Sequence, residues 1–193
     1  MWRMMDFLYD LSKIIRILIL LIKILPVLFF PELLSIEEIG KYGVIIAIVY
    51  LFIYAIGFEF WFIYNRRLAE TDNVKCRQGI IDSQNQYYLL HYIILIPFFI
   101  ILMGDYDNKV VLYSVLILTS YHLTQEMVRI LIHLHRHTSA GSVQLMQGVW
   151  ALLLPFGYID GVESLFYYTA ITALLGLILG FFILYFTEGL VFK

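Results

Sequence analysis

The sequence predicts an all-α polytopic membrane protein with six transmembrane helices. Of the 193 residues, 62% are hydrophobic and only 15% are charged, and the mean hydropathy is +0.85. A soluble domain carries roughly 25% charged residues, and a disordered chain needs low hydrophobicity and high charge. The apolar residues also form continuous runs of helical length, whereas a transmembrane barrel shows alternating segments of about ten residues.

Three runs in the first half approach the 20 or so residues that a transmembrane helix needs. They are 14–34, 43–64 and 87–103. Lys23 and Pro26 interrupt the first run. It is too long for a signal peptide and no small-residue cleavage site follows it, so we interpret it as an uncleaved span. The segment 65–86 is the longest polar connection, with room for a short surface helix but no separate domain.

Three further runs complete a single six-span domain over residues 1–193. They are 110–131, 142–159 and 164–186. The fourth span is the richest in polar residues, and the fifth is short and diluted by Gln144 and Gln147. In the sixth, Gly176 and Gly180 lie four residues apart, a spacing that favours close helix contact. That contact is either internal to the chain or between two chains.

The distribution of basic residues predicts that both termini are cytoplasmic. Alternating connections divide the chain ends and loops into two sides. The first side carries Arg3, Lys13, Arg16, Arg66, Arg67, Lys75, Arg77, Arg129, Arg136 and Lys193. The second side carries only Lys41 and Lys109 and is otherwise acidic. Because cytoplasmic loops carry the excess of lysine and arginine, the first side is predicted to face the cytoplasm.

Charged residues within the first two spans are candidates for a binding cavity, because charges in hydrocarbon are costly and usually face a cavity or a partner. Arg16 and Lys23 lie seven residues apart on one helix face. They form a basic track suited to a phosphate-bearing head group, or alternatively Lys23 extends to an interface or pairs with a carboxylate. Glu59 is either half of an ion pair between helices or a proton-coupling site.

The fourth span carries a polar stripe along one helix face. Its members are Thr119, His122, Glu126, Arg129, His133 and His137, at steps of three or four residues. Such a stripe lines a hydrated cavity or is buried against other helices, and Glu126 and Arg129 have the i,i+3 spacing of an ion pair. His133 and His137 are expected beyond the hydrocarbon.

Several other functions find no support in the sequence. It has no phosphate loop, dinucleotide-binding glycine pattern, GxSxG or HExxH motif, so we expect no enzyme activity and no cofactor. The segment HLHRH is not expected to bind a metal, because His135 points away from His133 and His137 and no further ligand is near. The net charge of −2 argues against nucleic acid as a partner. The single Cys76 allows no internal disulfide.

Several motifs follow one another along the chain. An apolar first helix is followed by a Leu-x-x-Glu-Glu-x-Gly-x-Tyr-Gly turn, here Leu34, Glu37, Glu38, Gly40, Tyr42 and Gly43. Then come Gly57, the basic exit Arg66–Arg67, the pair Glu126 and Arg129, and finally Arg136, Ala140 and Gly141. In these features the chain resembles the N-terminal six-helix lobe of polysaccharide and O-antigen flippases, members of the multidrug/oligosaccharidyl-lipid/polysaccharide exporter superfamily with a MATE-like fold. Such exporters have twelve or more spans in two lobes, and this chain corresponds to one of the two lobes.

The resemblance implies a half-size flippase-like protein of the bacterial inner membrane that takes part in translocating a lipid-linked oligosaccharide. A second copy, or another six-span half, would supply the missing lobe. The cavity candidates are Arg16, Lys23, Glu59, His122, Glu126 and Arg129, with the basic residues meeting the phosphate. The alternative is a non-transporting membrane subunit, an anchor or sensor that works with a partner. A transporter should show a pocket among spans one, two and four, whereas a scaffold should bury these charges as closed pairs.

Overall fold

The computed structural model describes residues 2–57, 60–71 and 73–190, and these residues form helices joined by short turns, with no strand among them. The helices are α1 (Trp2–Leu33), α2 (Ile36–Gly57), α3 (Phe60–Ala69), α4 (Val74–Leu102), α5 (Asn108–His133), α6 (His137–Gly148), the 3-10 helix η1 (Val149–Phe156) and α7 (Val162–Glu188). The all-α fold class is therefore confirmed.

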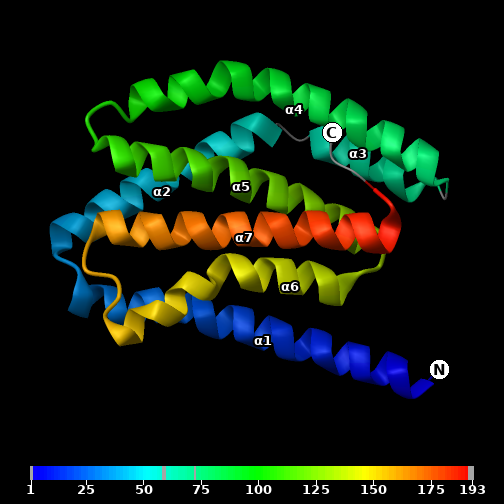
Figure 1. Ribbon diagram of the computed structural model, residues 1–193, viewed down its shortest axis with the longest axis horizontal. Coiled ribbons are helices and arrows are strands. Elements are labelled where there is room, and N and C mark those ends of the chain that lie inside the picture. The colour runs from blue at the N-terminus through cyan, green and yellow to red at the C-terminus, as the bar shows by residue number, and fades with distance from the viewer. Residues whose placement is uncertain (1, 58–59, 72, 191–193) are drawn as a thin grey trace.

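The chain runs back and forth along one axis, so its connections gather at two ends (Figure 1). The start of α1, the α3–α4 turn, the α5–α6 turn and the end of α7 lie at one end. The α1–α2, α4–α5 and η1–α7 connections lie at the other. This grouping is the one that the alternation of basic and acidic connections predicts.

Four helices are long and apolar enough to cross a membrane, counted over the described residues. These segments are Leu11–Leu33, Ile36–Gly57, Val74–Leu102 and Val162–Thr187. Their outer faces are apolar, as Leu89, Ile93 and Ile101 of α4 illustrate with exposed fractions of 60%, 64% and 73%. A surface of this kind is stable only against lipid or another apolar surface. The protein is therefore an all-helical, membrane-embedded protein.

Helix α5 lies inside the bundle, which explains why it is more polar than the four apolar helices. It packs against α2, α6 and α7 and more loosely against α4. Every side chain from residue 113 to residue 131 is buried or half-buried. A helix that other helices surround does not need a lipid-compatible surface, so its polar groups are tolerated when they find partners.

The helix ends carry local signals that fix where each helix begins. At the start of α2, Ser35 and Glu38 form a reciprocal capping box: the Ser35 N–H donates to Glu38 Oε2 at 2.9 Å, and the Glu38 N–H donates to Ser35 Oγ at 3.2 Å. Asn73 and Asp107 cap α4 and α5 by accepting from the backbone two residues on. These caps set the two sharp turns that return the chain.

The predicted 65–86 loop is wrong, because α3 reaches Ala69 and α4 already begins at Val74. The first turns of α4 are polar, so hydropathy places the start of the third span at residue 87. The N-cap at Asn73 allows the helix itself to begin 13 residues earlier, at Val74. The predicted fifth span, 142–159, covers the later part of α6, the 3-10 helix η1 and the first residues of the turn that follows.

Glycines in the later helices accept side chains from their neighbours. A Cβ on Gly141 would lie 2.8 Å from Cγ2 of Ile15, and a Cβ on Gly148 would lie 2.8 Å from Cγ2 of Ile22. Helix α1 therefore packs against α6 with two isoleucines, seven residues apart, in direct contact with two glycines. On α7, Gly176 faces Gln147 and Gly180 faces Met127. Of the two interpretations of the Gly176–Gly180 pair, the structure shows the internal contact.

Candidate functional site

A cavity of about 340 Å³ lies between α1, α2, α5, α6, η1 and α7. It forms because α1 packs against α6 and η1, while α2 packs mainly against α5, leaving space between the two helices. Its polar and aromatic lining consists of Lys23, Tyr42, Tyr50, Tyr121, Gln125, Gln144, Gln147, Trp150 and Thr169. Tyr50 is 42% exposed, so the cavity opens to the protein surface. This volume is at the lower end of those of small-molecule sites.

Lys23 is the cationic group of this cavity. It lies about midway along the apolar part of α1, which spans Leu11–Leu33. Among the residues that the structure describes, no carboxylate lies within ion-pairing distance of its amine. An ammonium at this depth, without a counter-ion from the described part of the chain, is suited to an anionic ligand.

Glutamine side chains give the cavity both hydrogen-bond donors and acceptors. Gln125 comes from α5, whereas Gln144 and Gln147 come from α6. The Nε2 of Gln147 is buried and has no hydrogen-bond partner among the described residues. Because a buried donor without a partner is costly, this amide is a group that a ligand in the cavity would satisfy.

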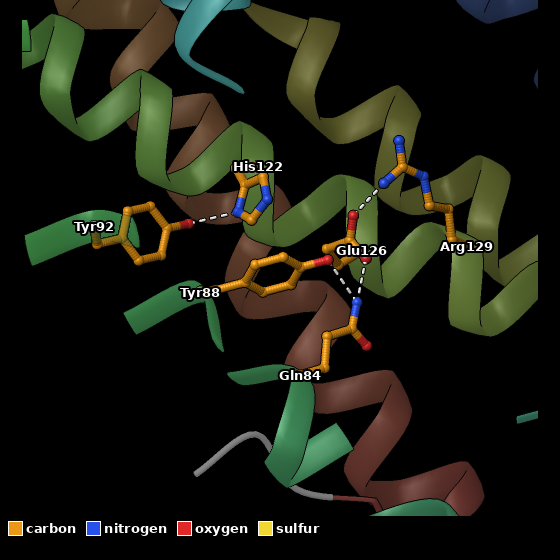
Figure 2. A network of polar contacts seen from close by, with 6 residues as sticks. All are labelled: Gln84, Tyr88, Tyr92, His122, Glu126 and Arg129. Carbon is orange, nitrogen blue, oxygen red and sulfur yellow. Dashed lines mark hydrogen bonds and ion pairs between the residues drawn. The ribbon is translucent and has the colours of Figure 1, made fainter. Parts of the chain in front are cut away.

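A second polar cluster joins α4 to α5 on a different side of α5 (Figure 2). Gln84 Nε2 donates to Glu126 Oε2 at 2.6 Å and lies at the same distance from the Tyr88 hydroxyl. The other carboxylate oxygen of Glu126 is paired with Arg129. Gln84, Tyr88 and Glu126 are each 1% exposed. The charge of Glu126 is therefore held in a closed ion pair rather than presented to an open cavity.

His122 forms the second link between these helices. Its Nδ1 is 2.6 Å from the Tyr92 hydroxyl, and its ring makes an edge contact with Tyr88 at 4.5 Å between centroids (Figure 2). A Cβ on Gly57 would lie 3.8 Å from His122 Nε2, so the end of α2 closes over the ring. That nitrogen is buried without a partner among the described residues.

Of the six residues predicted for one cavity, the five that the structure describes do not converge. Lys23 lines the cavity, and Arg16 is exposed on α1 outside it. His122 and Glu126, with Arg129, belong to the α4–α5 cluster. The reason is geometric: successive residues of α5 are rotated by about 100°, so Tyr121 and Gln125 face the cavity while His122 and Glu126 face α4. Glu59 lies outside the described residues.

The predicted stripe on the fourth span is shorter than its spacing indicates. Thr119 uses its hydroxyl to bond the Val115 carbonyl of its own helix. His133 is the last residue of α5, and His137 already belongs to α6. The chain turns between them, with His135 in the left-handed region at a φ of 58°. His137 therefore does not extend the stripe.

Sequence reasoning missed the partners of the buried charges. Gln84, Tyr88 and Tyr92 are spaced four residues apart on α4 and face α5. That spacing of polar groups was a usable signal, but the first two of these residues were divided between a presumed loop and a span. In the cavity, Gln125 and Trp150 were also missed.

Comparison of the chain with protein-family models, curated proteins and solved structures finds no match.

Proposed function

We propose that this protein is a half-size flippase-like membrane protein that binds the phosphate-bearing head group of a lipid-linked oligosaccharide and takes part in its translocation across the bacterial inner membrane. The observation that carries the proposal is the cavity around Lys23, whose amine has no carboxylate partner among the described residues. The pocket lies among spans one, two and four, where a transporter requires one.

Each part of the lining has a role in this proposal. Lys23 meets the phosphate, because an ammonium forms strong charge-assisted hydrogen bonds to phosphate oxygens. Gln125, Gln144 and Gln147 exchange hydrogen bonds with sugar hydroxyls. Arg16, two turns earlier on the same helix and exposed, attracts the anionic head group toward the cavity.

The proposed topology has six spans with both termini in the cytoplasm. It treats α5, and α6 together with η1, as crossing the membrane in addition to the four apolar helices. The central position of α5 and the two-ended arrangement of the connections support it (Figure 1). The surface opening of the cavity beside Tyr50 is the side on which a second copy, or another six-span half, would complete the binding site.

The test is binding and translocation of a fluorescent polyprenyl-diphosphate oligosaccharide. In nanodiscs, Lys23→Gln should weaken binding about tenfold or more, because a hydrogen bond to a charged group contributes about 1.5–3 kcal/mol. The matched control is Lys75→Gln, which removes an exposed lysine at the start of α4, away from the cavity. Equal binding by wild-type protein and Lys23→Gln would refute the role of the cavity.

The second candidate function is a non-transporting membrane subunit that works with a partner. The observation in its favour is the Glu126 carboxylate, which is closed off by Arg129 of its own helix and by Gln84 of α4 and does not line the cavity. Reconstituted vesicles separate the two. Translocation of the labelled lipid by the wild-type protein, together with its loss in Lys23→Gln, supports the flippase. Binding without translocation, both for the single chain and for a purified oligomer, supports the subunit.

A further inference from the structure

Helix α4 is packed tightly at its two ends and held by polar links between them. Near its start, Ile81 is buried in a cluster with Leu68 and Leu190. Near its end, Phe99 contacts Phe52 of α2 with ring centroids 5.2 Å apart. Between these anchors, the polar links to α5 are the hydrogen bonds of Gln84 and Tyr92 described above, and the ring of Tyr88 packs against His122. Figure 1 shows α4 arching above α5 and α7 over this stretch.

A groove of about 330 Å³ lies under the arch. Tyr88, Leu89 and Tyr92 of α4 line one wall, Phe181 of α7 lines the other, and Leu123 of α5 lies between them. These side chains are mainly apolar or present aromatic faces. Asn85 and Gln86 complete the lining on the part of α4 that is nearer its start.

The surface around the groove indicates what fills it. Leu89 of the lining, and Ile178 and Phe182 near the lining residue Phe181 on α7, have exposed fractions of 60%, 61% and 58%, so this face of the protein is apolar and suited to contact with lipid. An empty apolar void forfeits dispersion contacts along its walls. Water is a poor occupant of the apolar stretch between Leu89, Leu123 and Phe181, because a buried water needs two to four polar partners. A hydrocarbon chain from the surrounding bilayer provides the missing contacts.

The amides of Asn85 and Gln86 lie at the depth of a lipid head group. α4 has 29 residues and is about 44 Å long at 1.5 Å per residue, whereas the hydrocarbon is about 30 Å thick and takes about 20 residues. The 20 or so residues before the turn at Met103 fill that thickness, which leaves Asn85 and Gln86 near the boundary on the α3–α4 side. Amides there can bond the ester and phosphate groups of a lipid whose chain enters the groove.

We propose that the groove between α4 and α7 binds one acyl chain of a phospholipid from the leaflet on the α3–α4 side, with Asn85 and Gln86 at its head-group end. The lipid is a structural part of the bundle and fills the space that the polar links leave between α4 and α7. This site is separate from the Lys23 cavity and does not depend on the proposed transport activity.

The experiment uses the full chain in vesicles of phosphatidylethanolamine and phosphatidylglycerol that contain a trace of phospholipid with a diazirine on its acyl chain. After irradiation, peptide mapping should find adducts concentrated on Leu123 and Phe181, the half-buried residues of the lining. Adducts spread evenly over exposed positions such as Ile93 and Ile101 would overturn the proposal, because those side chains contact bulk lipid.

Variants that fill the groove provide the second readout. Leu123→Trp should lose most of the labelling at the groove, whereas Leu112→Trp, at a 56% exposed position on the same helix, should leave it unchanged. Leu89→Trp fills the groove from an exposed wall position and covers the case in which Leu123→Trp fails to fold. Full labelling of the groove in a folded filled variant would overturn the proposal.

Discussion

Gln84 and Glu126 are 42 residues apart in the sequence, yet the amide of the first donates to the carboxylate of the second at 2.6 Å, and both side chains are 1% exposed. This bond ties α4 to the central helix α5, and Arg129, on α5 itself, supplies the cation that pairs with the carboxylate. A buried carboxylate is stable only when its charge is balanced and its oxygens are bonded. The arrangement meets both conditions, so its main consequence is the position of α4.

The first prediction concerns Arg129. Arg129→Ala leaves the buried carboxylate of Glu126 without its cation, so we expect a loss of about 3 kcal/mol in the free energy of unfolding. The double variant Glu126→Gln/Arg129→Ala removes both charges and should recover much of this loss. Unfolding in mixed micelles of mild detergent and dodecyl sulfate, followed by circular dichroism, measures both. Additive losses in the double variant would show that the two side chains do not act as a pair.

The second prediction concerns the other link between α4 and α5. Tyr92→Phe removes the hydroxyl that bonds His122 Nδ1 and keeps the ring, so it should lower the free energy of unfolding by about 0.6–1.5 kcal/mol. Tyr54→Phe is the matched control, because Tyr54 is 74% exposed on α2. The same micelle titration compares them. Equal stability of both variants with wild type would mean that the His122 link contributes nothing to the helix packing.

Much of the fold followed from hydropathy and charge. The apolar run in the sixth span predicts α7 within two residues at each end, because no polar extension obscures its limits. The predicted start of the third span lies 13 residues after the start of α4, because the segment from Val74 to Gln86 is mostly polar and hydropathy alone therefore indicates a loop. Helix formation there depends on an Asn73 cap and on packing of Ile81, and neither is expressed as apolar periodicity.

The candidate site was predictable only in part. Charge within an apolar run identified Lys23 and Glu126 as unusual, and the i,i+3 spacing correctly paired Glu126 with Arg129. The sequence could not predict that Lys23 and Glu126 lie in different sites, because this depends on which neighbouring helix each face of α5 contacts. Gln125 was not singled out, and Gln147 was noted only as a polar residue that dilutes the fifth span. Only the tertiary fold brings them to one cavity with Lys23.

The third prediction tests the glycine contacts between α1 and α6. A Cβ on Gly148 would lie 2.8 Å from Cγ2 of Ile22, a stiff β-branched side chain that is 8% exposed. Gly148→Ala should therefore cost about 1–3 kcal/mol of unfolding free energy. Gly43→Ala is the control: nothing lies within 4 Å of its Cβ, so it should be neutral or stabilising by up to about 1 kcal/mol. Losses of unfolding free energy of the same size in both variants would contradict the close contact between Ile22 and Gly148.

The fourth prediction decides between six spans and four. If α5 and α6 with η1 cross the membrane, the α5–α6 turn lies on the same side as the α3–α4 turn; if they do not, it lies on the opposite side. In a Cys76→Ser background, His137→Cys places a single exposed thiol at the first residue of α6, beside the α5–α6 turn, and Asp105→Cys places one in the α4–α5 connection. Native Cys76, near the start of α4, reports the α3–α4 side. We expect an impermeant maleimide to label Asp105→Cys in intact cells, and Cys76 and His137→Cys only in inverted vesicles. Labelling of His137→Cys together with Asp105→Cys in intact cells, while Cys76 stays unlabelled, would leave four spans.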